Sequence, residues 1–421
     1  MNSELLLHMN RCTNKIKNKY GKRYIYKKFI VDVDLKQKVV FINADSTSID
    51  GTAIRYLLEI ISSYMYDKGI LRIKWKFKVN FLKPLSFKDK LVYVILEYIS
   101  LAILSEGFSI EYHFKEVLDY VWGGGFKDSP LNFLSNSNNK KYDCKNKVNE
   151  FKKYFTENDT HVLSSKYRKT IRSNEDLQTL FTDIGIFFRG VSLSKNFIFK
   201  EGDIERFSEV IAEIADNGLN HGNADCLVDV DVDDSYLSPN TKEKYIRVSV
   251  VSINLSKKEL HTDLKEMFSK AEDDDEYMRN TILKKKQLEE AFEAFITHRE
   301  NLFDDEYNEK HFFKTAVLQN KISGRVDSQG RAYIAGGTGF SVILKALEES
   351  AEDHVCYLMS GADVLMFEKE LLSSEKGKWV GYRDDVQYYS KKPDKAFLMK
   401  SRTHMPGVAY NLIFLFKKEE L

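Results

Sequence analysis

Apolar residues in the first 127 positions switch between strand-like and helix-like spacing. Val39-Val40-Phe41-Ile42 is a compact apolar run that predicts a buried strand, and the next apolar residues recur every three or four positions until Gly69. The order β-α-β-α-β predicts a small α/β domain over residues 1–127. The expected elements are a strand at 39–42, a helix at 53–65, a strand at 70–79, a helix at 88–104 and a strand at 109–114.

A stretch rich in Asn, Lys and Ser follows at 128–160 and predicts a linker. The pattern then changes, and helices grouped with mostly antiparallel strands predict a two-layer α/β sandwich over 161–421. The charged segment 260–314 carries an apolar helical face and predicts a helical insertion. The expected helices of the second domain lie at 177–190, 203–219 and 340–347, and its strands at 226–232, 246–253, 355–359, 364–367 and 410–416.

Composition and charge argue against several classes of protein. Lys and Arg number 64 against 63 Asp and Glu, so no overall charge draws the chain to nucleic acid or an anionic membrane. The most hydrophobic stretch, 91–104, contains Glu97 and is shorter than the roughly 20 residues of a membrane span. It predicts a buried helix. The N-terminus lacks the apolar core of a signal peptide, and the four cysteines form no CxxC pair. We therefore expect a soluble cytoplasmic protein without a zinc site or disulfides.

Three polar residues follow one stripe of the predicted helix 203–219 and its end. Glu213, Asn217 and His221 are four positions apart, so they lie on one face. An amide oxygen of Asn217 suits Mg²⁺, and a carboxylate at Glu213 suits a water-activating base. The alternative is an ordinary polar helix face that ends at Gly222.

A glycine-rich turn lies further along the chain. Gly336-Gly337-Thr338-Gly339 precedes the apolar helix that begins at Phe340. Glycines let main-chain N–H groups approach a polyphosphate closely, at the positive end of a helix dipole. The spacing fits neither a dinucleotide-binding fingerprint nor a Walker A motif, because no Gly-Lys-Ser/Thr follows. Alone, the turn is better explained as a helix-entry loop.

Together these motifs resemble the GHKL ATPases, the family of gyrase, histidine kinases and mismatch-repair ATPases. The helix with Glu213, Asn217 and His221 looks like the N box, and Gly337-Thr338-Gly339-Phe340-Ser341 looks like the G2 box. The resemblance covers roughly residues 165–416. It implies a Bergerat-type sandwich that binds ATP and Mg²⁺, with His221 and residues 336–341 near the nucleotide. It also implies Asn217 as the Mg²⁺ ligand and Glu213 as the base.

The third motif of that family, Asp-x-Gly-x-Gly, is missing. Asn254 stands where the adenine-reading Asp is expected, and Ser256 stands at a glycine position. An Asn oxygen accepts a hydrogen bond from the adenine amino group without the help of a charge. The charged insertion occupies the position at which the family has a flexible lid over the phosphates. Basic residues near its end either reach a γ-phosphate or are solvated surface charges. These are Lys321, Arg325 and Arg331.

Two further patterns have simpler explanations. Asp229, Asp231 and Asp233 alternate along a strand, which predicts a solvated sheet face rather than a metal site. The turn Ser48-Ile49-Asp50-Gly51-Thr52 weakly resembles the phosphorylated turn of STAS domains, and N-capping by Asp50 or Thr52 is the favoured explanation.

We therefore expect an ATP-binding regulatory protein in which nucleotide binding and slow hydrolysis change a partner interface. By family analogy, such proteins act in bacterial signalling or phage defence. The partner is a protein, a homodimer being one candidate. Two alternatives stay open: a serine kinase of the anti-sigma type, and a binding module without catalysis. No histidine has the context of a phosphoacceptor helix, so a two-component kinase is disfavoured.

Overall fold

A computed structural model describes most of the 421 residues. The described residues are 16, 23–66, 73–87, 89–118, 126, 129–135, 144–156, 165–199, 202–221, 224–237, 243–282, 286–319, 342–346, 356–367, 391–417 and 419–420.

The N-terminal region forms a five-stranded sheet of order β1-β2-β3-β5-β7. The first two pairings are antiparallel, whereas β3, β5 and β7 run parallel. A separate two-stranded parallel sheet is formed by β4 (Ser48–Ile49) and β6 (Ser86–Phe87). The strands of the larger sheet are β1 (Arg23–Tyr26), β2 (Phe29–Asp34), β3 (Val39–Ala44), β5 (Lys76–Phe81) and β7 (Ser109–Phe114).

Two long helices connect the parallel strands. In α2 (Gly51–Met65) the side chain of Asp50 accepts a hydrogen bond from the N–H of Ala53 at 2.7 Å, so Asp50 is the N-cap. In α3 (Lys90–Ser105) Asp89 caps Val92 in the same way at 2.9 Å. The expected β-α-β-α-β order is confirmed. Among the described helices, none is long and apolar enough to cross a membrane, and α3 is a buried helix as expected.

The stretch 128–160, expected as a linker, contains two helices. These are α4 (Pro130–Phe133) and α5 (Cys144–Thr156). Phe151 and Phe155 of α5 are buried, and the ring of Phe155 lies 4.7 Å from that of Tyr98 on α3. The prediction from composition was wrong for this part. The many Lys and Asn residues of α5 make the segment look like a linker, but its apolar residues pack into the N-terminal core.

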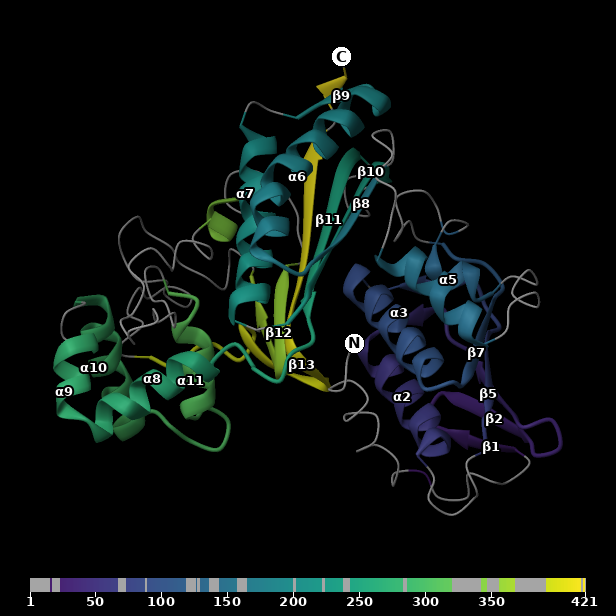
Figure 1. Cartoon of the computed structure of the whole chain (residues 1–421), viewed down its shortest axis with the longest axis horizontal. Coiled ribbons are helices and arrows are strands. Elements are labelled where there is room, and N and C mark those ends of the chain that lie inside the picture. Colours follow the sequence, from purple (N-terminus) through teal and green to yellow (C-terminus); the bar gives the residue numbers. More distant parts are fainter. Residues whose placement is uncertain are drawn as a thin grey trace.

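The second region forms an antiparallel sheet of order β12-β13-β11-β10-β8. One face, called here the front, packs against α6 (Asn174–Lys195) and α7 (Asp203–Asp216) (Figure 1). A short pair, β9 (Phe197–Ile198) with β14 (Glu419–Glu420), lies at one end. The five strands are β8 (Lys166–Ile171), β10 (Cys226–Leu237), β11 (Lys244–Asn254), β12 (Tyr357–Met366) and β13 (Leu398–Lys417).

The charged segment between β11 and β12 is helical, as expected. Its aromatic residues pack together, with the rings of Phe295 and Phe313 5.0 Å apart and Phe268 5.3 Å from Phe313. It comprises α8 (Thr262–Asp273), α9 (Asp275–Tyr277), the π-turn η5 (Met278–Ile282), α10 (Lys286–Asn301) and α11 (Glu309–Ala316).

The back face of the second sheet is covered by the N-terminal region. Leu227, Val251, Ile253 and Ala409 belong to the same buried cluster as the apolar residues of α2 and α3. The layers therefore run from the first sheet, through α2 and α3, to the second sheet and then α6 and α7 (Figure 1). The two regions share a core.

Candidate functional site

The end of α7 places two of the predicted site residues one turn apart. The N–H of Asn217 donates to the carbonyl oxygen of Glu213, and both side chains are half-buried. After Asp216 the helix widens into a π-turn, η4 (Asn217–His221). Such turns are rare and often occur at functional sites, because they change which side chains face a partner. The α-helical stripe predicted through His221 therefore holds only as far as Asn217.

Several polar side chains gather on the front face of the sheet beneath η4. That face is lined mainly by aliphatic and aromatic residues such as Val230, Val250 and Phe414. Beneath η4 the Sγ of Cys226 on β10 lies 3.2 Å from the Oγ of Ser252 on β11. Ser252 pairs in register with Tyr410 on β13. The three strands thus bring polar side chains together below the end of α7.

Tyr410 connects this polar floor to the helix above. Its hydroxyl is hydrogen-bonded to the side chain of Asn217, and its side chain is 4% exposed. Burial raises the pKa of the Tyr410 phenol above its usual value, so the phenol stays protonated. Sequence analysis missed Tyr410, because only the pairing of β13 with β11 brings it below Asn217.

Asn254 holds the other end of η4 in place. Its Nδ2 donates to the carbonyl oxygens of Gly218 at 2.6 Å and Ala224 at 2.9 Å, and its Oδ1 accepts from the N–H of Ser256 at 3.0 Å. Asn254 is 1% exposed. These contacts give Asn254 a structural role that the sequence did not predict. Both of its amide hydrogens bind the protein's own main chain.

The absence of a side chain at Gly218 allows this close packing. A Cβ at that position would lie 2.7 Å from the Sγ of Cys226. Any larger residue would push η4 away from the start of β10. A glycine after Asn217 is therefore needed for the turn to lie on the sheet.

Several predicted site residues lie outside the described residues. They are Gly336, Gly337, Thr338, Gly339, Phe340, Ser341, Lys321, Arg325 and Arg331, together with the side chain of His221. Helical residues 342–346 follow directly, and Ile343 and Leu344 belong to the core on the front face. The structure brings together Glu213, Asn217 and Asn254.

The chemistry of this site suits one kind of metal. Within the described part of the chain, no group of three or more His, Cys, Asp or Glu residues could hold a metal ion. Mg²⁺ keeps several waters and needs only one or two protein oxygens when substrate phosphates supply others. The amide oxygen of Asn217 fits that demand, with the carboxylate of Glu213 one turn away.

The Asp residues of β10 were expected on a solvated sheet face, and this expectation was wrong. Asp229 and Asp231 are 0% and 4% exposed, because the back of the sheet is covered by α3. Asp229 accepts from Arg168 Nε at 2.8 Å and lies 2.9 Å from Lys90 Nζ. Arg168 also donates to Glu97 on α3 at 2.7 Å. These cations hold the pKa of the Asp229 carboxyl well below its usual range although burial opposes them.

We call this set the interdomain charge network. Its six residues are all buried, with three cations and three anions, and α3, β8 and β10 each contribute: Lys90, Glu97, Lys166, Arg168, Asp229 and Asp231. A signal existed in the sequence, because Lys166 and Arg168 alternate on β8 opposite Asp231 and Asp229. It becomes visible only when the strand pairing is known.

A second buried ionic cluster anchors the helical insertion. The Nζ of Lys314 on α11 lies 2.7 Å from Asp363 on β12 and 2.8 Å from Glu259, which follows β11. Burial would raise the pKa of Glu259, but Lys314 and Lys310 lower it to about 2. Gly361 lets the Glu259 carboxylate approach, since a Cβ there would lie 2.3 Å from its oxygen.

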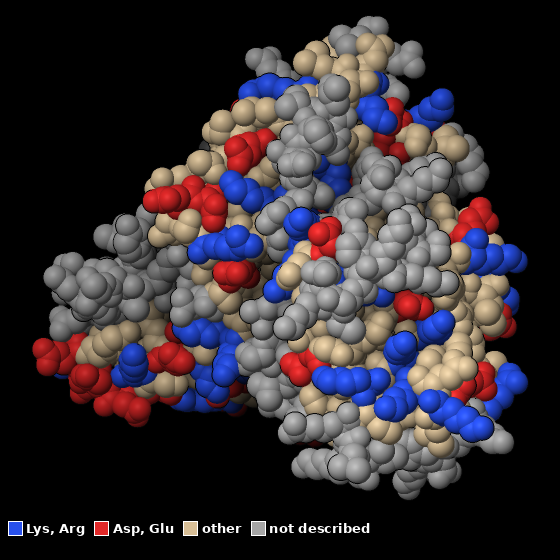
Figure 2. Space-filling view, turned by 45° about the vertical axis from the view of Figure 1, so that its right-hand side comes forward, with Lys and Arg blue, Asp and Glu red and all other residues tan. Residues whose placement is uncertain are grey.

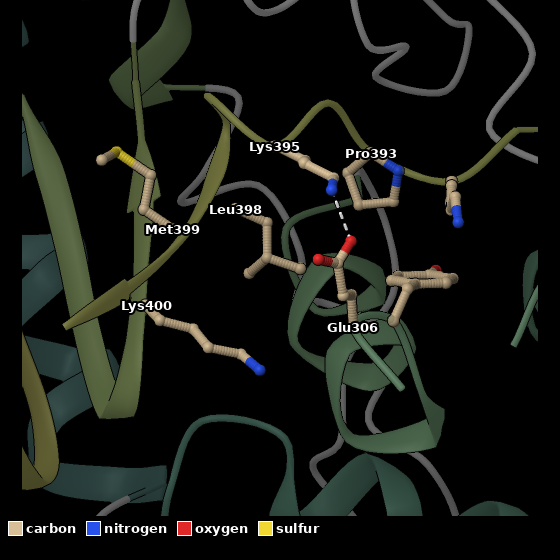
Figure 3. Close-up of a pocket in the computed structure, with 8 residues that line it drawn as sticks. Glu306, Pro393, Lys395, Leu398, Met399 and Lys400 are labelled. Carbon is tan, nitrogen blue, oxygen red and sulfur yellow. Dashed lines mark ion pairs between the residues drawn. The ribbon is translucent and has the colours of Figure 1, made fainter. Parts of the chain in front are cut away.

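A cavity of about 290 Å³ lies between the insertion and the start of β13 (Figure 3). Glu306 and Tyr307 line one side, and Lys395 on the other side pairs with Glu306 at 2.5 Å. The cavity shares no lining residue with the end of α7. Over the face shown in Figure 2, basic and acidic side chains are interspersed, as expected from the balanced composition.

Comparisons with known proteins identify no relative. No family model, curated protein or solved structure matches this chain.

Proposed function

We propose that this chain is an ATP-binding regulatory protein of the GHKL type, with its Mg²⁺ and phosphate site at the end of α7. Binding and slow hydrolysis of ATP would change an interface with a protein partner.

One observation carries the proposal: polar side chains from neighbouring strands gather under η4. Glu213 and Asn217 are one turn apart above them, and Tyr410 is hydrogen-bonded to Asn217. A buried polar group costs stability unless it is hydrogen-bonded, so a core seldom keeps several polar groups where packing alone is needed. The element order also supports the resemblance, because α7, β10, β11, the insertion, β12 and β13 follow one another as expected.

The chemistry follows from the two side chains on α7. A Mg²⁺ ion at this site would supply positive charge near the γ-phosphoryl group. Asn217 would hold it through its amide oxygen. Glu213 would orient and deprotonate the attacking water.

The alternative is a serine kinase of the anti-sigma type. Ser48 lies in β4, just before α2, and the carbonyl oxygen of Gly51 accepts from Thr403 Oγ1 on β13 at 2.6 Å. Helix α2 packs with the back of the second sheet, whereas Asn217 lies on the front. This arrangement disfavours phosphorylation of Ser48 by the site of its own chain. A kinase would act on another molecule.

Binding is tested by calorimetric titration with ATP in the presence and absence of Mg²⁺. We expect Asn217→Ala to weaken binding at least tenfold in Mg²⁺ and to have a smaller effect without it. Asn301→Ala is the matched control, because Asn301 is exposed at the end of α10 and its amide contacts Thr297. A wild-type protein that binds no ATP would leave only the binding module without catalysis.

Hydrolysis is tested by phosphate release from the same preparations. A general base contributes about 10²–10⁴ in rate, so we expect Glu213→Gln to lower turnover by that factor while ATP still binds. Glu209→Gln, exposed one turn earlier on α7, is the control and should hydrolyse normally. Equal rates for wild type and Glu213→Gln would remove Glu213 from this role. Labelled γ-phosphate that appears on protein would favour the kinase.

A further inference from the structure

The cavity between the insertion and β13 has no part in the proposed function. Its volume is about 290 Å³, and Glu306 and Tyr307, from the loop between α10 and α11, face residues between 392 and 400 across it (Figure 3). Small-molecule sites commonly have volumes of roughly 300–1,000 Å³, so this cavity suits a small ligand. Such a ligand would contact the insertion and the second sheet at once.

The loop that forms one wall of the cavity is held by its own hydrogen bonds. The side chain of Asp304 accepts from the N–H of Glu306 at 2.9 Å and from that of Tyr307 at 2.7 Å. The Tyr307 hydroxyl is hydrogen-bonded to Nδ1 of His298 on α10 at 3.0 Å, and Tyr307 is 3% exposed. A wall that is formed before the ligand arrives lowers the entropic cost of binding.

The opposite wall is fixed to the sheet. Phe397 is 1% exposed, and its carbonyl oxygen accepts from the N–H of Met366 on β12 at 2.9 Å. The N–H groups of Phe397 and Leu398 both donate to the carbonyl oxygen of Asp394 at 3.0 Å. These bonds close the turn that carries Lys395. Both walls therefore hold their side chains in place.

The cavity has more lysines than acids to neutralise them. Lys395 pairs with Glu306 at 2.5 Å, and Lys392 pairs with Asp304, so both ion pairs cross from one wall to the other. The third lysine is Lys400, which extends from β13 towards the insertion (Figure 3). Lys400 is exposed and forms no ion pair with any residue that the structure describes. One positive charge of the lining is therefore left for a ligand.

Apolar groups lie next to this charge. Leu398 and Lys400 are two positions apart on β13, so their side chains lie on the same face of the strand. Leu398 also packs against the core on the front face, and Pro393, which lines the cavity too, is buried. The cavity thus offers a fixed apolar surface beside a single unpaired cation.

We propose that this cavity binds a small organic monoanion, a carboxylate whose alkyl or aryl body lies against Leu398 and whose charge pairs with Lys400. A nucleoside triphosphate carries several negative charges, which one unpaired lysine does not match. A bound ligand contacts both walls and so holds the insertion against the sheet. The inference is independent of the proposed function, because the cavity shares no residue with the end of α7.

The test uses anilinonaphthalene sulfonate, an aromatic monoanion that fluoresces in apolar surroundings, on the full chain without nucleotide. We expect saturable binding, and we expect Lys400→Glu to raise the probe concentration at half-saturation at least about fivefold, because repulsion replaces attraction. Lys244→Glu is the matched control and should stay within twofold of wild type. Lys244 is likewise exposed on a strand, β11, without an ion pair to a described residue. Equal half-saturation for Lys400→Glu and wild type would overturn the inference.

Both substitutions replace exposed side chains, so both variants should fold, and circular dichroism checks this. Competition against the bound probe then separates charge from apolar contact. Phenylbutyrate joins a carboxylate to an apolar body, phenylbutanol has the same body without the charge, and inorganic phosphate has charge without the body. At equal concentrations we expect phenylbutyrate to displace the probe most strongly from wild type.

In Lys400→Glu, the advantage of phenylbutyrate over phenylbutanol should disappear. Equal displacement by these two compounds from wild type would overturn the role of Lys400. Equal displacement by phenylbutyrate and inorganic phosphate would overturn the apolar contact. Displacement by ATP that is lost in Lys400→Glu would also contradict the inference, because the cavity would then accept a polyanion. None of these results depends on whether nucleotide binds at the end of α7.

Discussion

At the scale of single residues, sequence and structure agree on Glu213 and Asn217 and differ on Asn254. The spacing of Glu213 and Asn217 sufficed to place them together, because four residues make about one helical turn. The contacts of Asn254 depend on the distant Gly218 and Ala224, and strand pairing with β13 places Tyr410. Local periodicity carries no information about such contacts.

A substitution at Asn254 distinguishes its structural role at η4 from the adenine-binding role expected from the sequence. Asn254→Asp would introduce the acidic residue of the motif that the sequence only resembles, but it would place a carboxylate against two carbonyl oxygens that now accept hydrogen bonds. We expect the free energy of unfolding in urea at pH 7 to fall by at least about 2 kcal/mol. The control Asn301→Asp, at an exposed helix end, should cost less than about 1 kcal/mol. A fully stable Asn254→Asp protein that binds ATP more tightly would return Asn254 to the adenine site.

At the scale of elements, most helices and strands follow from hydrophobic periodicity. The helices α2, α3, α6 and α7 and the central strands lie close to their expected positions, since each has one continuous buried face. Strands β1, β2 and β8 and helices α4 and α5 were missed. Their apolar residues are few or separated by Lys and Asn, so only tertiary packing reveals their buried side. The single strand β12 lies where two strands were expected, at 355–359 and 364–367.

The ionic cluster of Lys314 and Glu259, which His261 also contacts, gives a prediction about how stability depends on pH. Burial and the charge of Lys314 lower the pKa of His261 to about 4. Below its unfolded pKa of about 6.5, the unfolded chain binds a proton that the folded protein resists, so stability falls as pH drops from about 6.5 to 4. His261→Gln should flatten this slope in urea unfolding at pH 7.5 and 5. His113→Gln, exposed on β7, should leave it unchanged. Identical slopes for His261→Gln and wild type would contradict this assignment.

At the scale of the whole molecule, the sequence predicted two α/β regions but not how they join. The back of the second sheet packs apolar residues against α2 and α3, and the interdomain charge network crosses it. The alternating Asp residues of β10 looked like a solvated face because nothing in their own segment indicates that α3 covers them. The pattern of apolar residues along the chain does not show which two hydrophobic surfaces pack against each other.

The charge network yields a stability prediction for this docking. Asp229→Asn leaves three buried cations with two anions, so we expect a loss of about 3–5 kcal/mol in the free energy of unfolding. Glu205→Gln breaks the Arg189–Glu205 pair, whose side chains are 61% and 57% exposed, and should cost less than about 1 kcal/mol. Urea denaturation measures both. Similar small losses would show that the network does not hold the two regions together.

The central claim, that nucleotide binds at the end of α7, is tested most directly by hydrogen–deuterium exchange with and without a non-hydrolysable ATP analogue and Mg²⁺. Our account predicts slower exchange in residues 213–226, which include η4 and the start of β10. It would be contradicted by an analogue that binds, as calorimetry confirms, while exchange in 213–226 stays unchanged and slows instead around the cavity at residues 391–400.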